Sequence, residues 1–210
     1  ERYKEYFAKK GITLELVATA GSKENLLRLK DPTDRVQAAL VQGGMIAGES
    51  LQRIQSLGSV DYEPVWVFHR AALFNDKVHL VDRDLSQYRI AIGAPGSGTY
   101  AQAISILRLN DQPLAAPNLL TLSNAQAVSA LKSGEIDAVF LVDGFDSMHV
   151  QALIRDPAIH VSSFTRADAY TRLLTYFEKV TVPMGAFDLG KNLPPQGLEL
   201  LATTTNILID

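Results

Sequence analysis

The sequence contains no cysteine and no long apolar run. Without cysteine the chain cannot form a structural disulfide, use a thiol nucleophile or build a cysteine-ligated zinc site. Apolar runs such as AVFLV (138–142) fall far short of the roughly 20 apolar residues that a membrane-spanning helix needs. The lack of cysteine fits an exported protein as well as a cytosolic one, so it leaves the compartment open.

An excess of basic residues is also lacking. The 20 Lys and Arg residues are outnumbered by 23 Asp and Glu residues, which gives a formal net charge of −3 and a pI of about 5.8. A nucleic-acid-binding protein needs a basic stripe that neutralises phosphate groups. We therefore expect no nucleic-acid partner.

Motifs of metal and serine catalysis are missing as well. The histidines are scattered without paired spacing, and neither HExxH nor GxSxG occurs in the sequence. We therefore expect neither a metal site nor a Ser-His-Asp triad, and the sequence calls for no cofactor.

Apolar and amphipathic stretches alternate along the chain, which is typical of α/β folds. A first unit runs through a helix at 19–31, with Ser22 at its N-cap, into an apolar strand at 36–42. A second unit runs through a helix at 124–134, which a glycine ends, into a strand at 136–144. The other expected strands are 13–18, 63–71, 118–123, 159–164, 179–186 and 198–209, and the other expected helices are 46–56 and 166–177.

Two similar units predict an α/β protein with two Rossmann-like lobes. No low-complexity linker separates the units, so we expect hinge strands that cross between the lobes and a cleft between them. The expected division assigns residues 1–70 and 180–210 to lobe 1 and residues 71–179 to lobe 2. Both ends of the sequence have the pattern of truncated elements, and we expect terminal elements, and any targeting segment, to lie outside it.

A strand, a glycine-rich turn and a helix are expected across residues 88–110. The turn has the glycine spacing that opens a P-loop, but Thr99 and Tyr100 follow where that motif needs Lys and then Ser or Thr. It also matches G-x-G-x-x-A formally, yet the expected acid is missing from residues 116–123. A phosphate loop is thus excluded, and a dinucleotide-dependent enzyme stays a weaker alternative.

Backbone N–H groups and hydroxyls at a helix N-terminus suit a carboxylate or another small anion. Ser97, Gly98 and Thr99 occupy that position here. The alternative is that Ser97 or Thr99 only caps the helix, and both roles are compatible.

Other polar residues follow expected strands, where ligands bind in α/β sheets. The alternative is that they are ordinary turn residues without a ligand. Trp66 lies in a β-rich stretch expected to cross the cleft; it either builds a core or hinge or stacks on a ligand. The candidate residues at strand ends are Gly21, Ser22, Gln42, Gly43, Asp143 and Gly144.

Several motifs occur in an order that resembles the TAXI family, the solute-binding proteins of tripartite ATP-independent periplasmic (TRAP) transporters. GAPGSGT after a strand resembles that family's loop, and ATAGSKENLLRL resembles its segment of Gly-Ser followed by ENL. AALVQ, YEPVWVFHRA, ALKSGEIDAVFLVDG and VTVPMGAF resemble further segments of the family in the same order. The similarity extends over most of the chain.

The resemblance implies a type II periplasmic binding fold without catalysis. It implies a monomeric extracytoplasmic or periplasmic receptor, with or without a membrane anchor, that passes a small carboxylate or amino acid to TRAP permease subunits. Carried over residue by residue, Gly21, Ser22, Gln42, the loop 97–99 and 143–144 fall on cleft-facing loops. An acid at Asp143 favours an amine-bearing or neutral ligand. The alternative is the sensor domain of a membrane-bound signalling protein.

Overall fold

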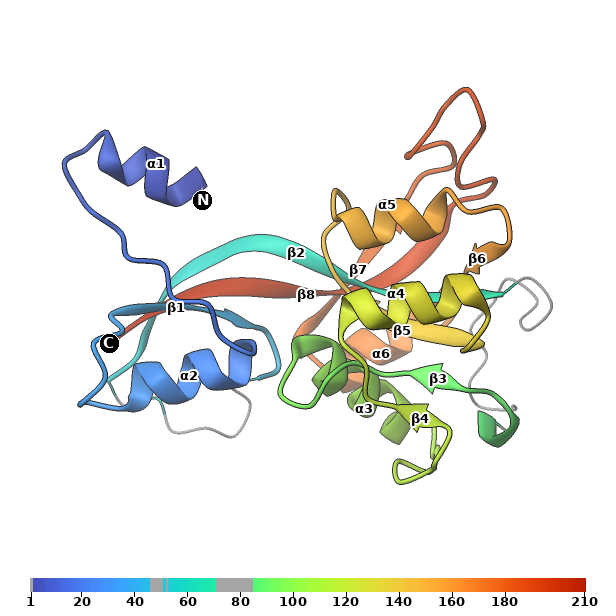
Figure 1. Cartoon of the computed structure of the whole chain (residues 1–210), viewed down its shortest axis with the longest axis horizontal. Helices are drawn as coiled ribbons and strands as arrows, with labels where there is room; N and C mark the ends of the chain where they lie inside the picture. Colours follow the sequence, from blue (N-terminus) through green and yellow to red (C-terminus); the bar gives the residue numbers. More distant parts are fainter. Residues whose placement is uncertain (1, 46–50, 52, 71–84) are drawn as a thin grey trace.

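The computed structural model describes residues 2–45, 51, 53–70 and 85–210. Its centre is one eight-stranded sheet with the strand order β1-β8-β2-β5-β3-β4, in which β6 also pairs with β2 and β7 with β8 (Figure 1). The mixed α/β fold expected from the sequence is confirmed. The strands are β1 (Ala38–Gln42), β2 (Gln55–Arg70), β3 (Ile90–Ala91), β4 (Leu119–Leu120), β5 (Ala138–Val142), β6 (Ile159–Val161), β7 (Phe177–Val182) and β8 (Leu198–Ile209).

The two longest strands, β2 and β8, pair antiparallel and run through the whole molecule (Figure 1). Their register extends from Gln55 opposite Ile209 to Val65 opposite Leu201, with two irregularities on the way. Burial along β2 changes where the strand enters the core. The first eight residues are exposed, and Pro64 to His69 are buried. The pair therefore joins two differently buried parts of the protein.

Two separate hydrophobic clusters lie along this strand pair. The small lobe is defined by the cluster in which α2 (Ser22–Lys30) packs on β1 and β8; its buried members are Leu26, Leu29, Ala39, Val41 and Leu208. The large lobe is defined by the second cluster, which α3 (Gly98–Leu109), α4 (Asn124–Ser133), α5 (Met148–Ile154) and α6 (Ala167–Leu173) build with the remaining strands. The residue boundaries expected for the lobes stay a prediction.

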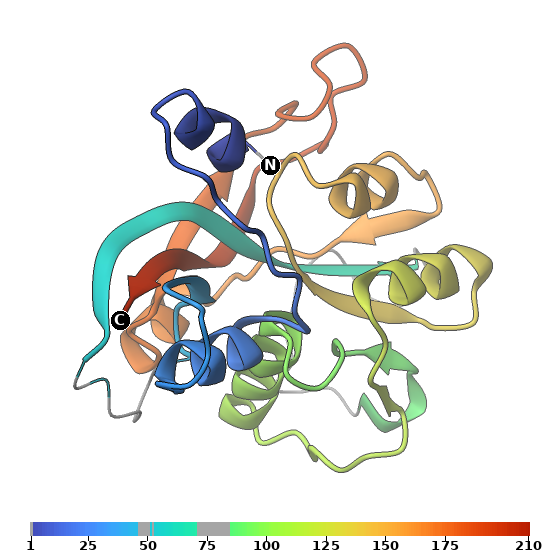
Figure 2. The same ribbon diagram turned by 60° about the vertical axis from the view of Figure 1, so that its left-hand side comes forward.

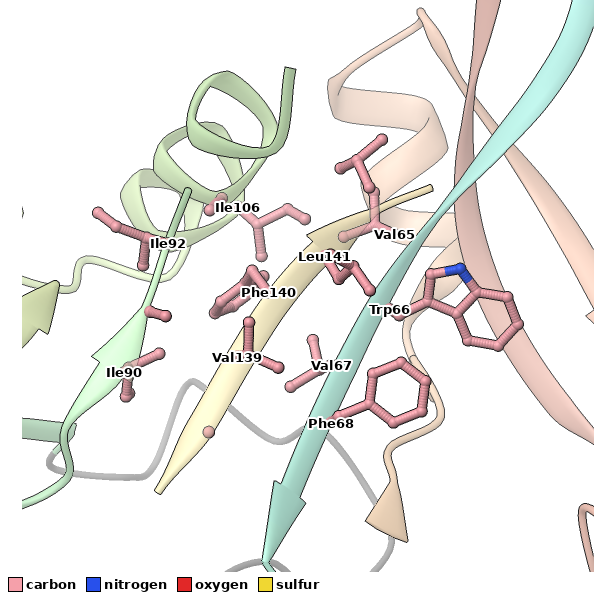
Figure 3. Packing of buried hydrophobic residues seen from close by; sticks show 14 of the residues in the cluster. Val65, Trp66, Val67, Phe68, Ile90, Ile92, Ile106, Val139, Phe140 and Leu141 are labelled. Carbon is pink, nitrogen blue, oxygen red and sulfur yellow. The ribbon is translucent and has the colours of Figure 1, made fainter. Parts of the chain in front are cut away.

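In the large lobe, parallel pairing of β4, β3 and β5 continues into the antiparallel pair β5–β2. All five residues of β5 are buried, as its apolar composition predicts for a strand covered on both faces. Figure 3 shows Trp66 and Phe68 on one side of β2 and Val65 and Val67 on the other, as the alternation of a strand requires.

Local capping chemistry places the large-lobe helices. Ser123 and Gln126 form a capping box at the start of α4, and Gly134 ends that helix with a φ of +80°. Ser97 caps α3, because its side chain accepts a hydrogen bond from the backbone N–H of Tyr100. The predicted end of α4 at a glycine and the capping role of Ser97 are thus confirmed. Among the described residues, no helix is both long and apolar enough to cross a membrane.

Some expected elements are wrong. Residues 13–18 form no strand; they follow α1 (Arg2–Ala8) as an extended stretch without a ladder partner among the described residues. A strand pattern needs a neighbouring strand edge, and here Leu16 and Val17 stay half-exposed instead. Ser22 does not cap α2, since Gly21 is the N-cap residue.

Other element boundaries differ from the expected ones because some residues expected to be helical belong to strands. The expected helix at 46–56 lies mostly outside the described residues, and its last two positions belong to β2. The helix expected at 166–177 ends at Leu173, since Phe177 begins β7. Helix α5 was not expected from the sequence at all.

Trp66 tests the packing of the large lobe. We expect Trp66→Ala to lower the free energy of unfolding by about 3–5 kcal/mol, because it empties a buried site beside other aromatic rings. Urea denaturation measures the loss. Leu189→Ala, at a side chain that is 87% exposed, is the control and should stay within about 0.5 kcal/mol. A loss below about 1 kcal/mol at Trp66 would contradict the described packing.

Candidate functional site

The two lobes meet where the N-terminal end of α3 faces the end of β1, close to α2 (Figure 2). Gly43, which follows β1, offers its backbone carbonyl to two donors: Gln102 Nε2 of α3 at 3.0 Å and Thr203 Oγ1 of β8 at 3.1 Å. Both donor side chains are buried. The main chain of the small lobe is therefore bonded directly to a helix of the large lobe.

Glycines allow this close approach. Gly44 has a φ of +81°, and a Cβ atom there would lie 2.6 Å from the ring of Tyr176 in the large lobe. A Cβ atom at Gly21 would lie 3.3 Å from the carbonyl oxygen of Gly96, in the glycine-rich loop. The pair Gly43-Gly44 and Gly21 thus bring the small-lobe backbone against the large lobe, where larger residues would hold the lobes apart.

Gln42, the last residue of β1, lies between the lobes. Its backbone N–H donates to Ser22 Oγ at 3.1 Å, and its side-chain Nε2 donates to the carboxylate of Glu63. The same amide lies against Gly98, where a Cβ atom would be 1.3 Å from Gln42 Oε1. That oxygen is buried and has no hydrogen-bond partner among the described residues. Ser22 and Gln42, which were both nominated from the sequence, are thus neighbours in the structure.

Glu63 of β2 shares a sheet face with Gln42 and two threonines of β8. Gln42 lies opposite Thr205, and Glu63 lies opposite Thr203, two residues away on the same strand. Burial raises the pKa of the Glu63 carboxyl above its ordinary value; hydrogen bonding from Gln42 and the nearby Thr205 hydroxyl oppose this, and the negative charges of Asp143 and Asp61 add to it. Glu63 is therefore a partly buried acid at the junction of the lobes.

The hydroxyls of the glycine-rich loop already have protein partners. Ser97 Oγ accepts from Tyr100 N–H at 3.1 Å and donates to the carbonyl of Ala94 at 2.7 Å. Thr99 Oγ1 accepts from Val142 N–H at 3.1 Å, which ties α3 to the end of β5. The backbone N–H groups of Gly98 and Thr99, by contrast, meet no acceptor in the part of the chain that the structure describes. These two N–H groups carry the anion-binding potential of the loop.

The Asp143-Gly144 turn at the end of β5 belongs to a different set of contacts. The Asp143 carboxylate accepts from Ser147 Oγ at 2.6 Å and from the Gly144 N–H at 3.0 Å, and it lies 3.0 Å from His149 Nδ1. Its charge still reaches Glu63, whose pKa it helps to raise. The acid expected to face a ligand is thus held by its own turn and by α5.

Trp66 is fully buried and packs only in the large-lobe core. Its ring stacks with Phe68 at 5.8 Å and meets Phe145 and Phe187 edge-on at 5.4 and 6.0 Å. Its Nε1 donates to the carbonyl of Asp143 at 3.0 Å. Of the roles left open for Trp66, the structure shows the core role.

The structure brings together seven of the candidate residues at one junction: Gly21, Ser22, Gln42, Gly43, Ser97, Gly98 and Thr99. It adds Glu63, Gln102 and Thr205, which sequence reasoning missed. A signal for Glu63 existed, since it is a charged residue directly before the buried half of a crossing strand. Whether any of these residues binds a ligand stays a prediction.

A separate cavity of about 600 Å³ lies in the large lobe between α5 and the segment after β7. It shares no lining residue with the junction of the lobes. Its lining residues are Phe145, Asp146, Gln151, Arg155, Thr181, Val182, Pro183, Ala186 and Phe187. Across the described ranges, no group of three His, Asp or Glu side chains is placed to hold a metal ion.

A model of the NMT1-like family matches residues 3–195. The chain belongs to the NMT1-like family. Among solved structures, this NMT1-like protein is similar to the arginine-bound form of truncated ArgBP from T. maritima, with a TM-score of 0.54 and 14% identity over 99% of this chain and 74% of that one. Likeness at this identity shows the fold alone, and the fold is that of type II periplasmic binding proteins.

Two further structures share the fold. The CcmR regulatory domain of Synechocystis PCC6803, in complex with 2-PG, has a TM-score of 0.54 and 13% identity over 100% of this chain and 79% of that one. The periplasmic aliphatic sulphonate binding protein SsuA from Escherichia coli has a TM-score of 0.52 and 15% identity over 76% of this chain and 53% of that one. The fold therefore occurs both in solute-binding proteins and in regulatory domains.

Glu63 gives the junction a pH-dependent stability. Its raised pKa means that the folded protein binds this proton more tightly than the unfolded chain does, so stability falls as pH rises from the ordinary carboxyl value through the raised one. The penalty is fully present once the pH exceeds the raised pKa. We expect Glu63→Gln to melt at a higher temperature than the parent protein at about pH 7, with the gain vanishing below about pH 4.

Thermal unfolding followed by circular dichroism over that pH range measures the difference. Glu178→Gln, at an exposed position of β7, is the control and should not reproduce the pH-dependent gain. A Glu63→Gln protein that melts lower than the parent at neutral pH would show that the carboxylate stabilises the fold instead.

Proposed function

We propose that this protein is a ligand-binding receptor that captures a small organic anion or amino acid where its two lobes meet. The observation that carries the proposal is the pair of backbone N–H groups at Gly98 and Thr99, which lack acceptors in the described chain and lie at a helix N-terminus beside the small lobe. Oriented N–H groups at such an end favour a negatively charged group. Small-lobe residues Ser22, Gln42 and Gly43 would border the site on its other side.

The fold supports this role. The similar solved structures are named as arginine-bound, 2-PG-bound and sulphonate-binding proteins, and both arginine and sulphonates carry an acidic group. None of those names describes an enzyme. We therefore propose binding without catalysis, and a site without Trp66, which is buried, and without the Asp143 carboxylate, which α5 and its turn occupy.

The order of the sequence motifs supports a TRAP permease as the proposed transport partner. The TAXI-like sequence of GAPGSGT, ENL, YEPVWVF and IDAVF segments supports a monomeric extracytoplasmic or periplasmic receptor that delivers its ligand to the membrane subunits of a TRAP permease. The crossing of the chain between the lobes belongs to the same proposal, with β2 and β8 as the hinge strands.

A regulatory domain is the second candidate. It is favoured by the similarity to the CcmR regulatory domain over the full length of this chain. Here the same ligand-dependent closure would signal to an attached domain. The full gene separates the two functions: a neighbouring permease supports the receptor, and a fused membrane segment with an output domain supports the sensor.

Thermal-shift screening of L-glutamate, L-arginine, succinate, ethanesulfonate and glucose tests the binding function. At least one ligand with an acidic group should raise the melting temperature in a concentration-dependent way, and glucose should not, because ligand binding to the native state stabilises it. If none of the acids at millimolar concentration stabilises the protein, the proposed function fails.

Gly98→Ala tests where the site lies. The added Cβ atom would meet the end of the flexible Gln42 side chain, so we expect folding to persist while the space beside the α3 N-terminus is filled. Calorimetric titration should show about a tenfold or larger loss of affinity. Gly197→Ala, at an exposed glycine with ordinary contacts, is the control and should bind like the parent protein.

A further inference from the structure

The junction of the lobes has hydrogen-bond donors at one end and a carboxylate at the other. The N–H groups of Gly98 and Thr99 face it from α3, and the carboxylate of Glu63 faces it from β2. The Gln42 amide touches both, since it hydrogen-bonds Glu63 and lies against Gly98. A site for a simple anion would have no use for a carboxylate at this place, because like charges repel.

An acceptor without a donor lies beside Glu63. Gln42 Oε1 is a buried oxygen atom with no hydrogen-bond partner among the described residues. The hydroxyl of Thr205, a residue that is only 9% exposed, lies beside the Glu63 carboxylate, which can accept a hydrogen bond from it. A buried acceptor that lacks a donor is destabilising, so Gln42 Oε1 and the carboxylate favour a group that brings N–H donors.

Among the described residues, no cation neutralises Glu63. Within the described ranges, no Lys, Arg or His forms an ion pair with its carboxylate, whereas Asp34, Asp137 and Asp168 each pair with a basic residue. Asp143 and Asp61 add further negative charge near Glu63. A protonated amine supplies both the missing positive charge and three N–H donors.

The Gln42 side chain imitates such a ligand. Its amide nitrogen donates to the acid, and its amide oxygen is turned to the side of Gly98, where the helix N-terminus lies. The oxygen gains no hydrogen bond there. The amide therefore occupies the space between Glu63 and the N-terminus of α3, but its oxygen atom accepts no hydrogen bond from the described residues.

We propose that Glu63 is the specificity-determining group of this site: it selects ligands that carry a protonated amine together with an acidic group, and the Gln42 amide holds their place until they displace it. The inference rests on the proposed function, because it assigns a selection rule to the same site. The ligand's acidic group lies at Gly98 and Thr99, and its amine replaces Gln42 Nε2 on the Glu63 carboxylate.

Matched pairs that differ only by the amine test the selection. Calorimetric titrations of the parent protein compare L-glutamate with glutarate and L-alanine with propionate. Where a pair binds, the amine-bearing member should bind at least about tenfold more tightly, because leaving a buried charge unpaired typically costs 2–5 kcal/mol. Equal or tighter binding of the deaminated acids would overturn the proposal while leaving the proposed function intact.

Two variants separate the roles of the residues. Glu63→Gln should lose at least about tenfold in affinity for the amine-bearing ligand and leave the deaminated acid unchanged or tighter, so that discrimination disappears. Glu178→Gln, at an exposed position of β7, is the control and should keep the discrimination. Retained discrimination in Glu63→Gln, in a protein whose melting curve shows it folded, would refute the role of Glu63.

Gln42→Ala tests the displacement. If the amide only holds the place, its removal should tighten binding of the amine-bearing ligand several-fold. Weaker binding would show that Gln42 contacts the ligand directly, and this part of the proposal would fall. If neither member of any pair binds the parent protein, while other acids in the thermal-shift screen do, the selection rule is wrong; if no acid binds at all, the proposed function fails first.

Discussion

The pairing of β2 with β8 is the interaction on which the rest of the structure depends. The two strands stay hydrogen-bonded from Gln55 opposite Ile209 to Val65 opposite Leu201, and both hydrophobic clusters are built along them. The same register puts Glu63 and Thr205 on one face, next to Gln42 of β1. A slip of one residue would turn these side chains to the opposite face of the sheet.

Close contacts between the backbones of the two lobes, together with the β2–β8 pair, form the junction of the lobes. Gly43 brings a carbonyl oxygen to Gln102 of α3, and Gly98 leaves room for the Gln42 amide at the start of that helix. A helix N-terminus and a partly buried carboxylate consequently face one small region between the lobes. The helix N-terminus favours a negatively charged group, and the carboxylate favours a positively charged one. The proposed site would therefore orient a ligand that carries both charges.

Local patterns predicted much of the fold. The glycine-rich loop before α3, the capped helix α4 that ends at Gly134 and the buried strand β5 depend on neighbours in sequence, and each was expected from the residues. Partners distant in sequence decided the rest. Residues 13–18 have a strand pattern but no strand beside them, and α6 is shortened because Phe177 joins β8 through β7.

The same distinction applies to the candidate site. Gly21, Ser22, Gln42 and the loop at 97–99 stand at the ends of recognisable elements, so the sequence could nominate them together. Glu63 was missed because its setting comes from Gln42, 21 residues before it, and from Thr205 on the last strand. Trp66 was ambiguous, since a pattern of aromatic residues does not show whether the protein's own core or a ligand covers the ring.

Backbone NMR of the ¹⁵N-labelled protein during titration with a ligand from the thermal-shift screen tests the central claim most directly. The account predicts that the largest amide shifts occur at Gly98 and Thr99, with further shifts at Gln42 and Gly43 on the opposite lobe. Shifts that gather instead around Phe145, Arg155 and Phe187, which line the other cavity, would contradict it.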